Sequence, residues 1–266
     1  MDNPIGIFDS GIGGLTVARE VIRLLPNENI VYFGDTARVP YGVKSKETVI
    51  RFSLENTLFL LQQGVKVIVI ACNTSSSLAL PIIRRHFKIP IIGVIMPGSK
   101  EGVYATRNKR IGVIGTRATI NSGAYEDEIK KLDATVKVFS QSCPMFVPLV
   151  EEGWAQDPIT RSIAQKYLGS LKAKAIDTLI LGCTHYPLLK TTIQSVMGKD
   201  VTLIDSAQQV ALEVKQVLIQ EGLLRKDKGS KPVRQYFVSD EVAIFENISR
   251  RILGHEIDHV RKVPYA

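Results

Sequence analysis

Short runs of Val, Ile and Leu alternate with longer amphipathic stretches along almost the whole chain. Continuous apolar runs of this length are typical of parallel strands that are buried on both faces. The amphipathic stretches between them have the spacing of helices that cover such a sheet. The pattern predicts strands at 5–9, 30–34, 65–71, 89–94, 111–115, 136–140, 178–181 and 201–204. It predicts helices near 14–25, 45–63, 75–87, 97–106, 121–132, 159–173, 187–197 and 207–221.

This alternation predicts an α/β protein with mainly parallel sheets. The end of the chain has a different pattern, because a charged segment at 225–231 precedes an apolar run at 233–238, a helical stretch at 240–253 and a short run at 257–263. No low-complexity segment and no Ser-, Gly- or Pro-rich linker divides the chain. A domain boundary is therefore expected inside an ordinary connection.

One internal repeat organises the sequence. The segment 67–74, Val-Ile-Val-Ile-Ala-Cys-Asn-Thr, is similar to the segment 178–185, Thr-Leu-Ile-Leu-Gly-Cys-Thr-His, and 5–10 is similar to 111–116. The two matches have nearly equal offsets and predict two related α/β halves with a pseudo-twofold relation. We expect one domain from 1–95 plus 208–266 and a second from 96–207. The alternative is that strand-then-loop segments resemble one another in any α/β protein.

Polar side chains follow four of the predicted strands, at the edge where open parallel sheets bind ligands. These hydroxyl, amide and carboxyl groups suit the carboxylates and ammonium of an amino acid better than an apolar ligand. The loop after 30–34 adds Pro40, Tyr41 and Gly42, with Tyr41 able to lie over a cleft, although the tripeptide also fits a simple turn. The strand-end candidates are Asp9, Ser10, Cys72, Asn73, Thr74, Thr116, Thr119, Cys183, Thr184 and His185, with Thr36 nearby.

The glycine-rich segment after Asp9 does not fit a dinucleotide site. Gly11 and Gly13 match the start of G-x-G-x-x-G, but Thr16 stands where the third glycine belongs, and Asp9 would repel a pyrophosphate. A tight turn into the next helix explains these glycines. Its backbone N–H groups would suit a carboxylate better than a phosphate.

Cys72, Cys143 and Cys183 are too few for a disulfide framework in a chain of this length and are expected to be thiols. Cys72 and Cys183 each follow a buried strand and precede a helix, whose N-terminus favours a thiolate. A lone cysteine in such a place is usually core, but twofold-related halves would bring these two thiols to opposite sides of one cleft. Two such groups can exchange the proton of a stereocentre, one removing it from one face while the other protonates the opposite face.

Neighbouring groups could assist the two thiols. His185 could tune Cys183 or act as an acid, and Asp9 could do the same for Cys72. Cys143 has no counterpart in the repeat, so we interpret it as structural. A zinc site is the competing hypothesis; it needs about four ligands, and the sequence contains no C-x-x-C pair. We therefore expect no metal at this site.

Charge leaves a binding function open. The chain has 34 Lys and Arg against 26 Asp and Glu, a net charge of +8 and a pI near 9.3. The basic residues form short groups beside acidic or apolar neighbours, which is typical of a solvated surface and makes a nucleic-acid partner unlikely. No apolar run is long enough for a membrane span and the start lacks the pattern of a signal peptide, so a soluble cytoplasmic protein is expected.

The motifs together resemble the glutamate racemase family, in order and in spacing, over about residues 5–206. The resemblance implies a cofactor-independent racemase that interconverts L- and D-glutamate and supplies D-glutamate for peptidoglycan synthesis. It also implies two α/β domains with the site between them, and a homodimer. The motifs are Ile7-Phe8-Asp9-Ser10-Gly11-Ile12-Gly13-Gly14-Leu15-Thr16, Gly34-Asp35-Thr36, Val39-Pro40-Tyr41-Gly42, Ala71-Cys72-Asn73-Thr74 and Gly182-Cys183-Thr184-His185-Tyr186-Pro187-Leu188.

The resemblance assigns roles to residues. Cys72 and Cys183 correspond to the two bases, the first for the D- and the second for the L-enantiomer, and Asp9 and His185 assist proton transfer. The substrate contacts correspond to Asp9, Ser10, Tyr41, Gly42, Asn73, Thr74, Thr184 and His185. One departure is Ser75, where the family usually has Ala. The alternatives are a racemase of aspartate or a related amino acid, a basic protein that binds DNA or a DNA-processing enzyme, and a thiol redox protein, which the missing C-x-x-C pair disfavours.

Overall fold

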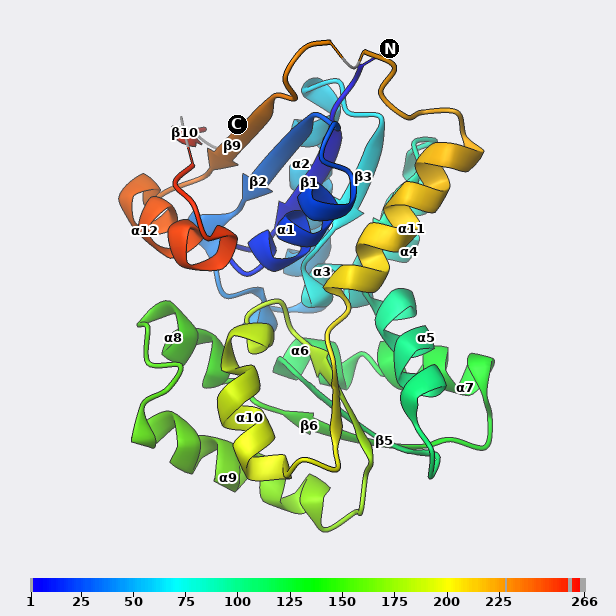
Figure 1. The fold of residues 1–266 in the computed structure, drawn as a ribbon, viewed down its shortest axis with the longest axis vertical. Coiled ribbons are helices and arrows are strands. Elements are labelled where there is room, and N and C mark those ends of the chain that lie inside the picture. The colour runs from blue at the N-terminus through cyan, green and yellow to red at the C-terminus, as the bar shows by residue number, and fades with distance from the viewer. Residues whose placement is uncertain (1, 228, 258–259, 264–266) are drawn as a thin grey trace.

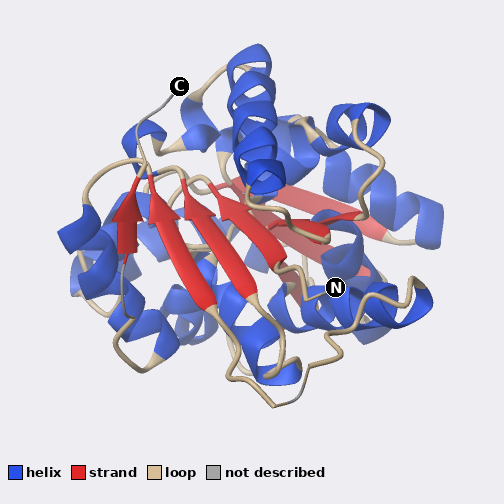
Figure 2. Ribbon diagram, turned by 90° about the horizontal axis from the view of Figure 1, so that it is seen from above, coloured by secondary structure: helices blue, strands red, loops and turns tan. Residues whose placement is uncertain are grey.

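The computed structural model describes residues 2–227, 229–257 and 260–263, and its strands form two separate parallel sheets (Figure 1). The first sheet has the strand order β10-β9-β2-β1-β3-β4, and every adjacent pair is parallel. Helices cover both faces of this sheet (Figure 2). Its strands are β1 (Ile5–Asp9), β2 (Ile30–Gly34), β3 (Val67–Ile70), β4 (Ile91–Gly93), β9 (Arg234–Val238) and β10 (Val260–Lys262).

The second sheet repeats the topology of the first. Its order is β6-β5-β7-β8, again with every adjacent pair parallel. The corresponding strands of the first sheet follow the order β2-β1-β3-β4, so each strand has a counterpart four positions later in the chain. The predicted α/β class with two similar parallel sheets is confirmed, and the matching order is consistent with a pseudo-twofold relation. These strands are β5 (Arg110–Gly115), β6 (Lys137–Ser142), β7 (Thr178–Gly182) and β8 (Thr202–Ile204).

Helices occupy most of the predicted amphipathic stretches. They are α1 (Leu15–Leu24), α2 (Lys46–Gln62), α3 (Asn73–Leu78), α4 (Leu80–His86), α5 (Ile95–Ala105), α6 (Arg117–Asn121), α7 (Ala124–Leu132), α8 (Phe146–Glu151), α9 (Pro158–Lys172), α10 (Lys190–Met197), α11 (Ala207–Gln220) and α12 (Val242–Leu253). Short 3-10 helices lie at η1 (Thr36–Arg38), η2 (Tyr41–Val43) and η3 (Tyr186–Leu189).

Three predicted helices differ from the structure. The stretch 75–87 is split at Ala79, where Pro81 in the first turn of α4 favours a new helix start because proline lacks an N–H. The stretch 121–132 begins only at Ala124, since Gly123 has a φ of 70°. The stretch 187–197 starts as the 3-10 helix η3 before α10. Helix α8 was not predicted at all, because its six residues are too short to display a helical period.

The apolar core joins the two sheets. One cluster contains Ile7 and Val69 of the first sheet, Val113 of the second, and Val210 of α11. A further cluster lies between β7, α9 and α10, and contains Leu168, Leu179 and Ile193. Because the main cluster crosses from one sheet to the other, packing alone does not mark a boundary. The predicted domain limits at 95/96 and 207/208 remain predictions.

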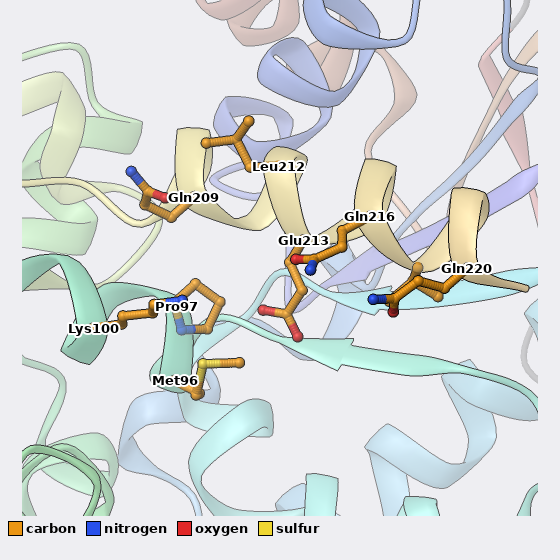
Figure 3. Close-up of a pocket in the computed structure, with 9 residues that line it drawn as sticks. Met96, Pro97, Lys100, Gln209, Leu212, Glu213, Gln216 and Gln220 are labelled. Atoms are coloured by element: carbon orange, nitrogen blue, oxygen red, sulfur yellow. The ribbon is translucent and has the colours of Figure 1, made fainter. Parts of the chain in front are cut away.

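The chain passes between the sheets through α5 and α11, which contact each other. A groove lies between the two helices, where Met96, Pro97 and Lys100 of α5 face Gln209, Leu212 and Glu213 of α11 (Figure 3). None of these residues belongs to the polar strand ends.

Among the described residues, no helix is long and apolar enough to cross a membrane. Of the predicted run 257–263, residues 258 and 259 lie outside the described part of the chain.

Candidate active site

The polar loops of the two halves converge on one cavity of about 300 Å³, including the space at its mouth. Most of the predicted site residues line it, although their side chains come from the carboxyl ends of strands in two different sheets. The lining consists of Ser10, Val39, Pro40, Tyr41, Gly42, Cys72, Asn73, Thr74, Thr116, Val147, Cys183, Thr184 and His185. Asp9 and Thr119 are buried and contact this lining from behind.

Cys72 forms the N-terminal cap of α3. Its sulfur accepts a hydrogen bond from the Ser75 N–H at 3.5 Å, and its thiol donates to Ser10 Oγ at 3.5 Å. Burial and, after it, the negative charge of Asp9 raise the pKa of Cys72 to about 11, although the contacts with Ser10 and Ser75 partly oppose the rise. Cys72 is therefore a thiol at neutral pH.

Cys183 lies beside an imidazole instead. His185 Nδ1 is 3.9 Å from the Cys183 sulfur, and His185 Nε2 is 3.1 Å from a carboxylate oxygen of Glu151. Burial would lower the pKa of His185, but its contacts with Cys183 and Glu151 outweigh burial and hold that pKa well above 6.5. The arrangement thiol–imidazole–carboxylate favours an imidazolium next to Cys183.

Glu151 was missed by the sequence analysis. It ends the short helix α8, and the sequence around it carries no strand-end pattern and no motif. Only the packing of α8 against η3 brings this carboxylate to His185. A buried histidine calls for a carboxylate partner, so the sequence could have been searched for an acidic residue that pairs with His185. Nothing in the local sequence, however, distinguishes Glu151 from Glu152.

Asp9 is completely buried at the end of β1. Its carboxylate accepts the N–H of Gly11 at 3.0 Å and the hydroxyl of Thr184 at 3.3 Å. Burial raises the pKa of Asp9, whereas the charge of His185 and the N–H groups of Gly14 and Gly11 lower it. Since Asp9 accepts the Gly11 N–H, this group does not point freely toward a substrate carboxylate as we had expected of the loop.

Two glycines allow the halves to meet closely at the cavity. A Cβ on Gly13 would lie 2.4 Å from Thr184 Oγ1 and 2.5 Å from His185 Nδ1. A Cβ on Gly42 would lie 2.3 Å from the Cβ of Thr116. Each distance is far below van der Waals contact, so a larger residue at either position would force the contacted side chains to shift.

Three threonine hydroxyls bridge the halves. Thr74 Oγ1 lies 2.9 Å from Thr116 Oγ1 and 3.2 Å from Thr119 Oγ1, and the last two are 3.0 Å apart. Beside them, Tyr125 donates its hydroxyl hydrogen to Asn73 Oδ1 at 2.7 Å. Asn73 is therefore held with its amide nitrogen available as a donor.

The loop that carries Pro40, Tyr41 and Gly42 is anchored by Asp35. The Tyr41 hydroxyl and the Arg38 guanidinium both donate to the Asp35 carboxylate. Tyr41 lines the cavity as expected, but its hydroxyl is directed away from it. Thr36 does not reach the cavity, because its hydroxyl exchanges hydrogen bonds with the backbone of Asp240.

Cys143 does not line the cavity. Its thiol donates weakly to the carbonyl of Gln141 at 3.7 Å, and its own carbonyl accepts the Tyr186 hydroxyl at 2.8 Å. Burial raises the pKa of Cys143. In the described part of the chain, no group of three or more His, Cys, Asp and Glu side chains is arranged to hold a metal ion.

Comparisons with known proteins agree with this geometry. A profile of the family described as Asp/Glu/Hydantoin racemase matches residues 5–214. A glutamate racemase of Geobacter metallireducens is 48% identical over 259 residues, which cover 97% of this chain and 96% of that protein. The solved structure of a Bacillus anthracis glutamate racemase superposes with a TM-score of 0.94 at 42% identity, covering 98% of this chain and 97% of that one. The Francisella tularensis glutamate racemase, solved in complex with D-glutamate, has a TM-score of 0.93 at 40% identity, with 99% and 98% covered.

The profile match over residues 5–214 shows that the chain belongs to the Asp/Glu/hydantoin racemase family of amino-acid racemases. Its two parallel-sheet halves, whose polar strand ends meet at one cavity, agree with this class. Within it, the extent and level of identity place the chain among the glutamate racemases.

Proposed function

We propose that the protein interconverts L- and D-glutamate without a cofactor, by proton transfer at the α-carbon between Cys72 and Cys183. The observation that carries this proposal is the equivalent placement of the two thiols. Each follows the corresponding strand of its sheet, β3 or β7, and both line the same cavity. Racemisation needs an acid and a base on opposite faces of one carbon, and this pairing supplies them.

The comparisons with known proteins favour glutamate as the substrate. The similar curated proteins are named glutamate racemases, and one similar solved structure holds D-glutamate. The hydroxyl groups of Ser10, Thr74, Thr116 and Thr184 and the amide of Asn73 offer hydrogen bonds to two carboxylates and an ammonium. An aspartate racemase remains the second candidate, because thiol chemistry does not distinguish the two substrates.

In the proposed mechanism Cys72 acts from the small fraction of its sulfur that is thiolate, since its pKa is about 11. This thiolate removes the α-proton of D-glutamate and becomes a thiol, and the Cys183 thiol protonates the opposite face and becomes a thiolate. The Cys183 thiolate that results is stabilised by the imidazolium of His185, which Glu151 holds in its charged form. From L-glutamate the same steps run backwards, with Cys183 as the base. Asp9 is proposed to assist at the Cys72 side, and Asp9, Ser10, Pro40, Tyr41, Gly42, Asn73, Thr74, Thr116, Thr119, Thr184 and His185 are proposed to form the binding site.

The biological setting follows from the product. D-glutamate made by this reaction would be consumed in peptidoglycan synthesis, and we propose a cytoplasmic homodimer, with domains 1–95 plus 208–266 and 96–207 closing over the substrate. Sedimentation equilibrium of the purified protein would test the dimer. A monomer at all concentrations would contradict it without affecting the proposed reaction.

The direct test follows L-glutamate in deuterium oxide with purified protein and reductant. We expect loss of the α-proton signal in the NMR spectrum together with loss of optical rotation. Exchange without inversion would leave one base misassigned. If neither the α-proton signal nor the optical rotation changed, the proposal would be defeated. Turnover of L-aspartate in place of L-glutamate would favour the second candidate. Normal turnover with excess reductant and no disulfide partner would exclude a thiol redox protein.

A further inference from the structure

Ser75 has a hydroxyl group that nothing in the folded chain explains. The residue is completely buried in the first turn of α3, three positions after Cys72. Its N–H donates to the Cys72 sulfur, yet its Oγ has no hydrogen-bond partner among the described residues. A buried hydroxyl without a partner is costly, so such groups in native proteins call for an explanation.

The second half of the molecule suggests one. Cys183 has an imidazole beside it, from the residue two positions later, His185. The residue two positions after Cys72 is Thr74, and its hydroxyl is turned toward Thr116 and Thr119 instead. The counterpart of Ser75 is Tyr186, whose hydroxyl is directed to the Cys143 carbonyl. Cys72 therefore lacks the kind of partner that Cys183 has, and the unpaired hydroxyl next to it is that of Ser75.

We propose that Ser75 is a positioning residue for proton transfer at Cys72, and that its hydroxyl donates a hydrogen bond to the sulfur while the sulfur is a thiolate. The Ser75 side chain is among the groups that lower the pKa of Cys72 and so work against burial and Asp9. In the thiol state the hydroxyl is unpaired, and in the thiolate state it gains an anionic acceptor. The pairing thus favours the charged state that catalysis requires.

The consequence for turnover rests on the proposed function, but the effect on the thiol does not. The substitution Ser75→Ala removes the hydroxyl and keeps the N–H contact and the helix. A hydrogen bond to a charged group of this kind corresponds to a pKa rise of about one unit when it is lost. Well below its pKa, a thiol is alkylated in proportion to its thiolate fraction. The alkylation rate of Cys72 should therefore fall about tenfold at constant pH.

The experiment compares iodoacetamide labelling of Cys72 and Cys183 in each protein, quantified peptide by peptide with mass spectrometry across a range of pH. We expect Ser75→Ala to lower the labelling rate of Cys72 about tenfold and to leave the labelling rate of Cys183 unchanged. The matched control is Ser77→Ala, in the same helix, whose hydroxyl donates to the Thr74 carbonyl rather than toward the thiol. It should leave both rates unchanged. Thermal unfolding of Ser75→Ala should occur at the same temperature or higher, because the lost hydroxyl had no partner.

An unchanged Cys72 rate in Ser75→Ala would overturn the proposal, and so would an equal slowing of Cys72 in Ser77→Ala. A fall in melting temperature with no change in labelling would give Ser75 a purely structural role. Racemisation is measured on the same samples, with kcat/KM expected to fall in step with the labelling rate. A wild-type protein that does not racemise glutamate, but whose Cys72 labelling still depends on Ser75, would defeat the proposed function and leave this inference standing.

Discussion

The two thiols of the cavity occupy equivalent positions in the fold but have different surroundings. Cys183 faces an imidazole that a carboxylate supports. Cys72 faces the hydroxyl of Ser10 and a backbone N–H, with the charge of buried Asp9 nearby. The difference teaches that the repeated topology fixes where the sulfurs lie, whereas the loops after each strand determine which groups surround each sulfur. A racemase needs the first feature to be symmetric and tolerates asymmetry in the second.

The largest expected effect comes from removing either sulfur. If both thiols act in each direction, Cys72→Ser and Cys183→Ser should each lower kcat by about 10²–10⁴-fold with both enantiomers, the usual contribution of a positioned acid or base. Polarimetry with L- and D-glutamate measures this. Cys143→Ser is the control, because Cys143 lies outside the cavity lining, and it should keep its activity if it folds.

Full activity in either cavity variant would defeat the two-thiol mechanism. Loss in only one direction would also contradict it, since both thiols take part in every turnover.

The next largest effect tests whether the loop of Gly13 must approach Thr184 and His185 as closely as it does in the structure. Gly13→Ala would place a methyl group 2.4 Å from Thr184 Oγ1 and 2.5 Å from His185 Nδ1, so the Cys183 side must shift. A displacement of about 1 Å in a catalytic group can cost about 10²-fold in rate, and we expect a loss of that order in kcat/KM. Gly169→Ala is the control, because a methyl group there meets nothing within 4 Å.

Gly169→Ala should be fully active and slightly more stable, as expected for alanine in place of glycine inside a helix. Wild-type kinetics in Gly13→Ala would mean that the close approach at this position is not needed for turnover.

A smaller effect concerns the imidazole alone. Glu151→Gln removes the carboxylate that helps to raise the pKa of His185, so that pKa should fall toward 6.5, as NMR titration of the histidine would record. We expect kcat/KM to fall about tenfold at neutral pH, less than the usual 10²–10⁴-fold contribution of an acid or base, because the imidazolium only supports the Cys183 thiolate. Glu152→Gln is the control, since Glu152 is exposed and adjacent.

The sign of the stability effect follows from the raised pKa. A histidine with a pKa above its unfolded value stabilises the folded state fully below about pH 6.5, and this contribution is lost as the pH rises through the folded value. Glu151→Gln should therefore lower the free energy of unfolding by about 1 kcal/mol near pH 6 and by less at alkaline pH. An equal loss at both pH values would point to packing rather than charge.

Much of the fold follows from the sequence because buried parallel strands leave continuous apolar runs. Every strand predicted in 5–204 is present, with ends that differ by at most two residues. The pairing of Asp9 with Cys72 at one edge of the first sheet was also predictable, since the carboxyl ends of parallel strands meet at one edge of a sheet. The internal repeat predicted that Cys183 and His185 of the second sheet face them across one cleft. Their roles remain predictions.

What the sequence analysis missed depends on tertiary contacts. Glu151 reaches His185 only through the packing of α8, and Thr36 was expected near the cavity although its hydroxyl pairs with Asp240, some two hundred residues away. The split of 75–87 into α3 and α4 depends on Pro81. Short helices and long-range polar pairs have no periodic signal, so local patterns do not reveal them.

The smallest effect separates the two causes that raise the pKa of Cys72. Burial is the larger cause and the charge of Asp9 the next one. Asp9→Asn removes the charge without changing the size of the side chain or exposing the thiol, so the pKa of Cys72 should fall below about 11, but by less than one unit. Iodoacetamide labelling of Cys72 at constant pH should then accelerate less than tenfold. A larger acceleration would show that the Asp9 charge contributes more to the raised pKa of Cys72 than its rank behind burial suggests. The contrast with Cys183 would then depend mainly on the difference between one carboxylate and one imidazole.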